Sequence, residues 1–484
     1  MAYKKMIFSS RLVVLLVFLV LLLQSTVNAA EIFLMDEESL KKEALNSPTI
    51  KNINASFLAS KFSEAQLLEK FQPQLEGDIS HFVAQQNTVA PFPITSPINN
   101  LSLGITKDFS TGMSLGVFNI MNKRKYGSFG SDARTTLAAE FSMDLYRDIF
   151  GRTSKAEISY LSFEKEIAQI QSKIDQKIFL INLTKIYWSL ILNEEALKIS
   201  QNLLKISKKQ ELDAKKRFRD NIADSGEVSR QISQTSSRQT DIYNLQNQKE
   251  LYILSLKELL PTIANKKVEL KKYNFAKKER EIQDLISAIK SNKNPPMNLT
   301  YYDDIIKYIT KSYKQQKKIT NSYADVDFEL YSRYEKSQRD NAISNTFGDV
   351  HNYQDNNYEV GLRLKVPLGS AKKSSKAIKK DIERDRYFAN RNQNMAKIES
   401  YHSQTILNIS ILTSALESQK NNISNLKESL RVSNKKFNQA RIPLRDLIED
   451  QNLYFQSLLN AVGLKSLIIN QALNYATIFT DIDL

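Results

Sequence analysis

Residues 358–376 read YEVGLRLKVPLGSAKKSSK and change their pattern halfway along. Over the first part, apolar side chains alternate with others from Tyr358 to Leu368, which predicts a β-strand at 358–368. From about residue 374, apolar positions recur three or four residues apart, which predicts a helix over 374–439. The unit from which this fold is built is therefore a strand that leads directly into a very long helix.

The same change of pattern occurs earlier in the chain. An alternating stretch at 137–145 precedes a helical pattern over 153–219, and further alternating stretches lie at 75–83 and 326–334. Each is close to the ~9–11 residues of a tilted transmembrane strand. A soluble hairpin alternates in the same way, so the pattern alone leaves both readings open.

Two polar segments without periodicity, 121–133 and 335–357, are predicted to be exposed loops. Residues 101–105 and 113–117 alternate around the turn KDFSTG at 107–112, which indicates one more β-hairpin. The sequence leaves open whether this hairpin adds strands to the sheet or lies outside it.

The chain contains an internal repeat. RFRDNIADSGEV at 217–228 aligns with KFNQARIPLRDL at 436–447, at an offset of 219 residues. Each half runs helix, strand, loop, strand, long helix, turn and helix, and further helices are expected at 48–70 and 446–478. A 65-residue helix would be about 100 Å long at ~1.5 Å per residue. We divide the mature chain into a first repeat at 30–260, a linker at 261–294 and a second repeat at 295–484.

The N-terminus indicates export. Lys4, Lys5 and Arg11 precede an apolar core at 12–23, and Val27-Asn28-Ala29 is a small-residue cleavage site, so 1–29 is expected to be a signal peptide. The alternative is an uncleaved anchor, but twelve apolar residues are few beside the ~20 of a spanning helix. A net charge of +15 would suit binding to nucleic acid, but an exported protein is not expected to meet it. We therefore expect no nucleic-acid partner.

The composition excludes several kinds of site. With no cysteine in 484 residues, disulfides, thiolate metal sites and a lipidated cysteine are excluded, and the three histidines are scattered. The sequence has no Ser/His/Asp order, HExxH motif or Walker loop, so we expect no enzyme, no cofactor and no metal. The chain has only 12 glycines and 10 prolines, and this scarcity of helix-breaking residues favours long helices. Two strands in each half give four per chain, too few to close a barrel, so closure requires oligomerisation.

These features resemble the TolC family of outer-membrane efflux channels over essentially the whole mature chain. The resemblance rests on ALNSPTIKNINASFLASKF at 44–62, KIYWSLILNEEAL at 185–197 with its Tyr187-Trp188 pair, the strand-to-helix segment at 358–376, and FNQARIPLRDLIEDQNLYFQSLLNAVGLK at 437–465. It implies an α+β membrane protein of the Gram-negative outer membrane. Three chains would form one twelve-stranded β-barrel, continuous with an antiparallel coiled-coil tunnel in the periplasm.

The resemblance also implies partners and a mechanism. The homotrimer would be a passive exit duct for efflux or type I secretion. A periplasmic adaptor and an inner-membrane pump or ABC exporter would open it at its helical tips. The alternatives are a periplasmic coiled-coil scaffold without channel activity, which leaves the strands unexplained, and an exported enzyme.

Site residues are expected at the tips of the two helical hairpins. The family's tip glycine is matched by Asn221 and Ala440, and alanine tolerates positive φ poorly, so we expect a different turn at Ala440. Asp446 and Glu449 match acidic positions of the family's aperture and share one helix face, although acidic residues also suit a first helical turn. The further gate candidates are Glu227, paired with Arg441 or Arg445 of a neighbouring coil, and Phe437, for which a packing role is the alternative.

Two other surfaces are expected to bind partners. The adaptor would dock around the tips, at Asn221, Ile222, Val228, Ala440 and Leu447. Basic residues just after strands would lie beneath the inner lipid leaflet and attract anionic head groups, unless they only form a solvated helix face; they are Lys372, Lys373, Lys376, Arg152 and Lys155.

Overall fold

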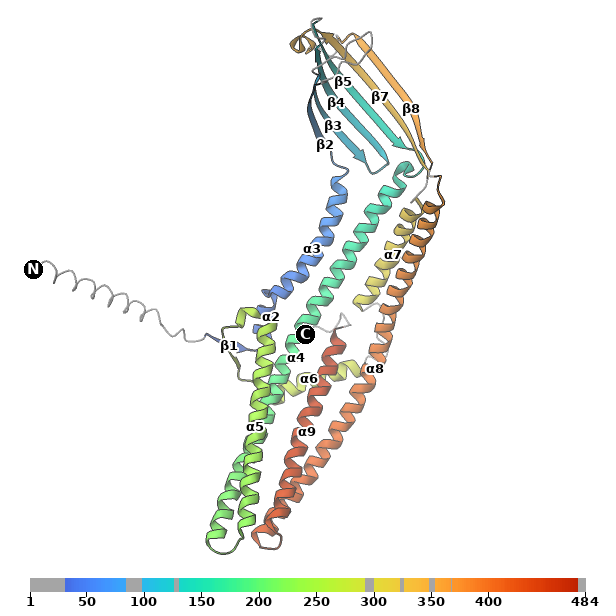
Figure 1. Ribbon diagram of the computed structural model, residues 1–484. Helices are drawn as coiled ribbons and strands as arrows, with labels where there is room; N and C mark the ends of the chain where they lie inside the picture. Colours follow the sequence, from blue (N-terminus) through green and yellow to red (C-terminus); the bar gives the residue numbers. More distant parts are fainter. Residues whose placement is uncertain are drawn as a thin grey trace, which may run out of the picture. The chain divides into compact units, whose positions relative to one another are not determined.

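The computed structural model describes residues 31–83, 98–125, 130–291, 300–322, 326–347, 353–366 and 368–477. The expected signal peptide at 1–29 lies outside the described residues. The helices are α2 (Glu37–Leu45), α3 (Pro48–Glu69), α4 (Arg152–Arg219), α5 (Ser225–Leu259), α6 (Phe275–Ser291), α7 (Tyr301–Ser322), α8 (Ser370–Asn438) and α9 (Leu444–Ala476). The strands are β1 (Ile32–Met35), β2 (Gln74–Phe82), β3 (Ile98–Phe109), β4 (Met113–Lys125), β5 (Ser131–Asp144), β6 (Lys267–Leu270), β7 (Asp327–Asp340) and β8 (Asp355–Lys365). Figure 1 labels all of these elements except β6.

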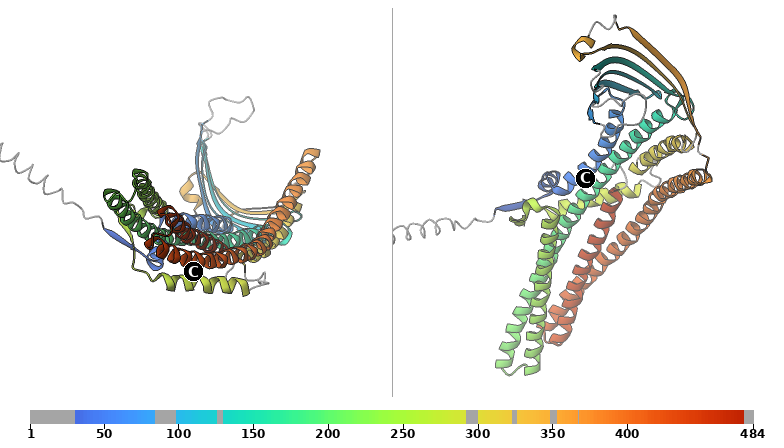
Figure 2. Two further views of the ribbon diagram at one scale, coloured as in Figure 1. Left: turned by 90° about the horizontal axis from the view of Figure 1, so that it is seen from below. Right: turned by 45° about the horizontal axis from the view of Figure 1, so that its top comes forward.

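Six of these strands form one sheet, in the order β2-β3-β4-β5-β7-β8, with every neighbouring pair antiparallel. The sheet is curved (Figure 2), and among the described residues no further strand pairs with its two outer strands, β2 and β8. The hairpin expected around 107–112 is present as β3 and β4, and it lies inside the sheet between β2 and β5. The chain therefore contributes six strands to this sheet, where the two halves alone predicted four.

The predicted loops at 121–133 and 335–357 were too long. Strand β4 continues to Lys125, β5 begins at Ser131, β7 continues to Asp340, and β8 begins at Asp355. The alternation of apolar residues fades where β4 and β7 end and β5 and β8 begin, because hydrogen bonds between polar side chains replace apolar packing there. Thr135 is fully buried, and its hydroxyl lies 2.6 Å from that of Thr346 in a short 3-10 turn, Ile343–Thr346.

The long helices confirm the helical pattern. Helices α4 and α8 contain 68 and 69 residues, so each is about 100 Å long at ~1.5 Å per residue. Helix α5 follows α4 and α9 follows α8 after short turns, which makes two long helical hairpins (Figure 1). No helix in the described part of the chain is both long and apolar enough to cross a membrane.

The chain divides into two compact units. The first contains the chain up to Ile53, Ile174–Leu299 and the chain from Glu399 onward, and the second contains Asn54–Lys173 and Thr300–Ile398. Each sequence repeat therefore contributes to both units. The first unit also contains a two-stranded parallel sheet of β1 and β6, and its apolar core includes Met35, Leu40, Ile181, Trp188, Leu256 and Leu473.

Candidate functional site

The first tip, residues 219–225, joins α4 to α5 through a turn that satisfies the last carbonyls of α4. Asn221 has a φ of 58°, and its backbone N–H donates to the carbonyl of Phe218 at 3.1 Å. The N–H of Ile222 donates to the carbonyl of Arg217 at 2.8 Å. This pair of bonds is the Schellman arrangement, in which the residue after the helix is left-handed. Asparagine is among the few side chains that adopt this conformation readily.

The second tip, residues 438–444, joins α8 to α9 with the same geometry. Ala440 has a φ of 54°, and its N–H donates to the carbonyl of Phe437 at 2.9 Å. The N–H of Arg441 donates to the carbonyl of Lys436, also at 2.9 Å. Our expectation of a different turn at Ala440 was therefore wrong. The two hydrogen bonds keep the alanine left-handed, at a cost of about 1 kcal/mol.

A single cation, Arg217, joins the two helices of the first hairpin at the tip. Its Nη1 lies 3.1 Å from Oε1 of Glu227, and its guanidinium lies 5.8 Å from the ring centre of Phe437 on α8. In this chain Glu227 thus pairs with Arg217, and the expected link to Arg441 of a neighbouring coil stays a prediction. We did not predict Arg217, although the repeat aligns it with Lys436 and it lies in the basic last turn of α4.

The expected acidic aperture residues lie in the first two turns of α9. Asp446 is partly exposed, and its Oδ1 is 3.6 Å from Nε of Arg445. Glu449 is exposed and lies three residues further along the helix. Both carboxylates therefore remain accessible to solvent in one chain, and their gathering into a ring requires further copies. The contact with Arg445 partly offsets the charge that such a ring would carry.

The residues expected to meet an adaptor differ in their exposure. Ile222 is 66% exposed, and Asn221 and Ala440 are also exposed. Val228 is half-buried, and Leu447 is only 3% exposed, so its side chain supports the tip from within. Between α5 and α9 lies a groove of about 480 Å³, whose lining includes Glu227, Arg230, Gln231, Gln234, Leu444 and Arg445.

The basic residues expected near lipid lie at the starts of α4 and α8. Lys372 and Lys373 are exposed, whereas Lys376 donates from Nζ to the backbone carbonyl of Asn321. Lys155 donates to the carbonyl of Phe150 at 3.0 Å. Arg152 is exposed, and its guanidinium is 3.5 Å from the carbonyl of Arg147 and from the hydroxyl of Ser322. Lys155 therefore also fixes the start of α4, and Arg152 and Lys376 join the starts of α4 and α8 to the end of α7.

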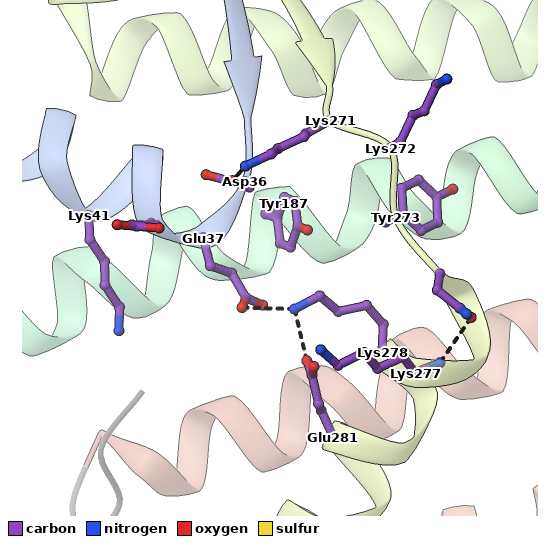
Figure 3. Close-up of a pocket in the computed structure, with 12 residues that line it drawn as sticks. Asp36, Glu37, Lys41, Tyr187, Lys271, Lys272, Tyr273, Lys277, Lys278 and Glu281 are labelled. Atoms are coloured by element: carbon purple, nitrogen blue, oxygen red, sulfur yellow. Dashed lines mark hydrogen bonds and ion pairs between the residues drawn. The ribbon is translucent and has the colours of Figure 1, made fainter.

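A second hollow, of about 500 Å³, lies beside the small β1–β6 sheet (Figure 3). Lys278 lies between Glu37 and Glu281, with its Nζ 2.9 Å and 2.8 Å from their carboxylates. Lys271 donates to Asp36 at 2.6 Å, and this bond lowers the pKa of the Asp36 carboxyl from 3.8 to about 2. These pairs tie α2 and β1 to the segment that follows β6.

The aromatic pair that supports the resemblance belongs to this same unit. Trp188 lies in the apolar core, and Tyr187 is nearly buried beneath the ion pairs, so burial raises the pKa of Tyr187 to about 12. Tyr187 therefore stays neutral at ordinary pH, and the pair stabilises the unit. Among the described residues, no three His, Asp or Glu side chains are grouped closely enough to hold a metal ion.

Comparison with known proteins gives structural matches only. No protein-family model matches the chain, and no curated protein matches its sequence. The outer membrane protein VceC of Vibrio cholerae matches with a TM-score of 0.66 at 13% identity, over 91% of this chain and 95% of its own. The outer membrane channel CmeC of Campylobacter jejuni matches with a TM-score of 0.67 at 11% identity, over 92% and 87%.

A third structure, the open state of the outer membrane channel MtrE of Neisseria gonorrhoeae, matches with a TM-score of 0.60 at 11% identity, over 91% of this chain and 88% of its own. At such identities the likeness establishes the fold. The chain has the fold of TolC-type outer-membrane channels, as the sequence predicted.

Proposed function

We propose that this chain is one subunit of a trimeric outer-membrane exit duct. The observation that carries the proposal is the contrast between the two faces of the six-stranded sheet. One face is apolar and uncovered from edge to edge: Ile79 on β2 is 83% exposed, Tyr358 on β8 is 85% exposed, and Leu103 and Val117 are exposed between them. A water-soluble sheet would have to cover such a face, whereas lipid covers it without cost.

The opposite face of the sheet is polar and suits a water-filled lumen. Arg333 on β7 contacts Glu140 on β5 at 2.9 Å and Glu335 at 2.6 Å. Arg363 on β8 contacts Glu329 on β7 at 2.9 Å. Charged side chains on one face and apolar ones on the other are the pattern of transmembrane barrels that enclose water. The fold shared with outer-membrane channels supports the same assignment.

The helical tips are the gate of this duct in our proposal. Arg217 holds the first hairpin closed through Glu227 and contacts Phe437 of the second. In a trimer, Asp446 and Glu449 from each chain would form an acidic ring that attracts cations and repels anions. An adaptor of helical structure would enter the groove between α5 and α9 and compete for the contacts of Arg217 with Glu227 and Phe437. An inner-membrane pump or ABC exporter would supply the energy, because the chain has no nucleotide-binding motif.

The proposal places the sheet in the outer membrane and the long hairpins in the periplasm. Lys372, Lys373 and Arg152, at the strand-to-helix junctions, would then meet the head groups of the inner leaflet, each with about 1 kcal/mol of attraction. A soluble periplasmic scaffold is the competing function. It accounts for the long hairpins but gives no reason for the uncovered apolar face of the sheet.

Membrane fractionation separates the two functions. We expect the protein to stay with outer membranes through washes with high salt and carbonate, to need detergent for extraction, and to migrate on a gel as a heat-sensitive trimer. A scaffold would be released by the washes and would show no trimer band. Release without detergent would therefore overturn the proposal.

A further inference from the structure

The hairpin of β3 and β4 is an integral part of the sheet. Residues Ile98–Thr106 of β3 pair with Gln74–Phe82 of β2 on one side, and Ile98–Phe109 pair with Met113–Arg124 of β4 on the other. Strand β4 in turn pairs with β5 from Met113↔Met143 to Lys125↔Ser131. Strands β3 and β4 lie between β2 and β5, so removal of the hairpin would separate β2 from the rest of the sheet.

The turn of this hairpin is fastened to the junction between β5 and α4. Gly112, with a φ of 76°, accepts at its carbonyl a hydrogen bond of 2.9 Å from the N–H of Asp144. Gly151, with a φ of 78°, lies so close to the turn that a Cβ there would be 1.8 Å from the carbonyl oxygen of Ser110. A Cβ at Gly112 would similarly be 2.3 Å from the carbonyl oxygen of Asp148. The hairpin and the helix start are thus built to fit each other.

Both faces of the sheet continue through the hairpin without interruption. On the apolar face, Leu75 of β2 is opposite Ile105 of β3, which is opposite Val117 of β4 and then Ala139 of β5. A hairpin folded against the outside of a barrel would have to hide one of its faces. Instead, the register gives β3 and β4 the same lipid-facing and lumen-facing sides as the strands that flank them.

The two edges of the sheet are suited to each other. All nine residues of β2 are exposed, as are nearly all of β8, and in the described part of the chain no strand pairs with the outer side of either. With six antiparallel strands, β2 and β8 run in opposite directions, as neighbours in a barrel must. On the polar face, towards the strand ends that lead to the helices, β2 carries Glu76 and Asp78 and β8 carries Arg363 and Lys365. Long uncovered edges of this kind pair with another chain.

We propose that β8 of each copy pairs with β2 of the next, so that three copies close a barrel of eighteen strands. This rests on the proposed trimeric duct and adds the width of its membrane pore. At a strand spacing of ~4.8 Å and a tilt of ~40°, twelve strands give a backbone radius of about 12 Å and eighteen give about 18 Å. The inserted hairpin therefore makes the barrel about half as wide again.

A distance measurement across the trimer tests the strand number. The chain has no cysteine, so Tyr334→Cys gives each copy one spin-label site, on the apolar face of β7 and one strand in from the seam. Equivalent backbone positions in a trimer are separated by ~1.7 radii, which is about 31 Å for eighteen strands and about 21 Å for twelve. The outward arm of the label lengthens both values equally. We expect pulsed electron–electron double resonance on the detergent-extracted protein to give the longer distance.

A deletion of residues 98–125 is the matched control, because it leaves β2 and β5 antiparallel and joined by the segments that remain. The deletion should shorten the distance by about 10 Å. If the deleted chain does not assemble, the distance in the full-length chain still decides the strand number. The shorter distance in the full-length chain would overturn the eighteen-stranded barrel and leave the trimeric duct standing. The absence of any dipolar coupling would overturn the trimer itself, and the barrel with it.

Discussion

At the scale of single residues, the two tips show how one backbone geometry is reached with different side chains. Asn221 and Ala440 occupy equivalent positions of the repeat, and both are left-handed. The sequence indicated the turns and the acidic residues beyond them. It could not indicate that alanine would accept the strained conformation, because the two backbone hydrogen bonds that hold it there depend on the fold of both helices.

Replacement of Ala440 by glycine should stabilise the second tip. Glycine adopts positive φ without the steric cost of alanine, so the gain should be about 1 kcal/mol, partly offset by the greater freedom of glycine in the unfolded chain. We expect hydrogen–deuterium exchange at the end of α8 to slow by up to about fivefold. Asn221→Gly is the control and should change the first tip much less, because asparagine already tolerates this φ. Unchanged or faster exchange in Ala440→Gly would contradict the account.

Replacement of Arg217 by alanine should loosen the closed tips. The change removes the ion pair with Glu227 and the contact with the Phe437 ring, which together contribute about 1 kcal/mol at this partly exposed site. The current through the closed channel in planar bilayers should therefore rise, by up to about fivefold.

Arg219→Ala is the matched control for this variant, since it removes the same charge from an exposed side chain two residues further along. We expect its current to remain that of the unaltered chain. Equal currents from both variants would remove Arg217 from the gate.

Acid should weaken the anchoring of β1 and α2 through Asp36. Its pKa is lowered in the folded protein to about 2, chiefly by the bond from Lys271, so its contribution is present above pH ~4 and is lost as the pH falls towards 2. That contribution is at most about 2 kcal/mol. Asp36→Asn should therefore lower the midpoint of thermal unfolding at pH 6, and the difference from the unaltered chain should shrink by pH 3. A difference that does not change with pH would contradict this role.

At the scale of elements, the sequence predicted the helices closely and the sheet less completely. Helices expected at 153–219 and 374–439 are Arg152–Arg219 and Ser370–Asn438, because apolar positions recur three or four residues apart along each of them. The strands were longer than expected because Thr135, Thr346 and their neighbours are satisfied by hydrogen bonds, which leave no apolar alternation. The position of the β3–β4 hairpin within the sheet depends on its pairing with β2 and β5. A local sequence pattern does not indicate which strands will pair.

The junction between β5 and α4 should depend on Gly151. An alanine there would have to adopt a φ of 78° and would overlap the carbonyl oxygen of Ser110, so we expect a loss of about 2 kcal/mol or more. The trimer of Gly151→Ala should dissociate at a lower temperature on a gel. Gly369, just before α8, is the control, because a Cβ there meets nothing within 4 Å and Gly369→Ala should be nearly neutral. Equal dissociation temperatures for the two variants would show that the junction is not tightly fitted.

At the scale of the whole molecule, one chain is an incomplete object. In the described part of the chain, no strand pairs with the outer sides of β2 and β8, and the apolar face of the sheet is exposed. Asp446 and Glu449, the proposed aperture carboxylates, are accessible near the start of α9. In the proposed duct, further copies and lipid would complete each of these features. Part of the positive charge of the sequence comes from the basic residues at the strand-to-helix junctions, which would lie against anionic head groups in the proposed duct.

Single-channel recording of the detergent-extracted protein in planar lipid bilayers shows whether the assembled chain is a gated duct through the outer membrane. We expect each trimer to insert as one conducting unit, with a small closed-state current that prefers cations and grows when Arg217 is replaced by alanine. A protein that inserts no conducting unit, and that leaves its membranes without detergent, would contradict it.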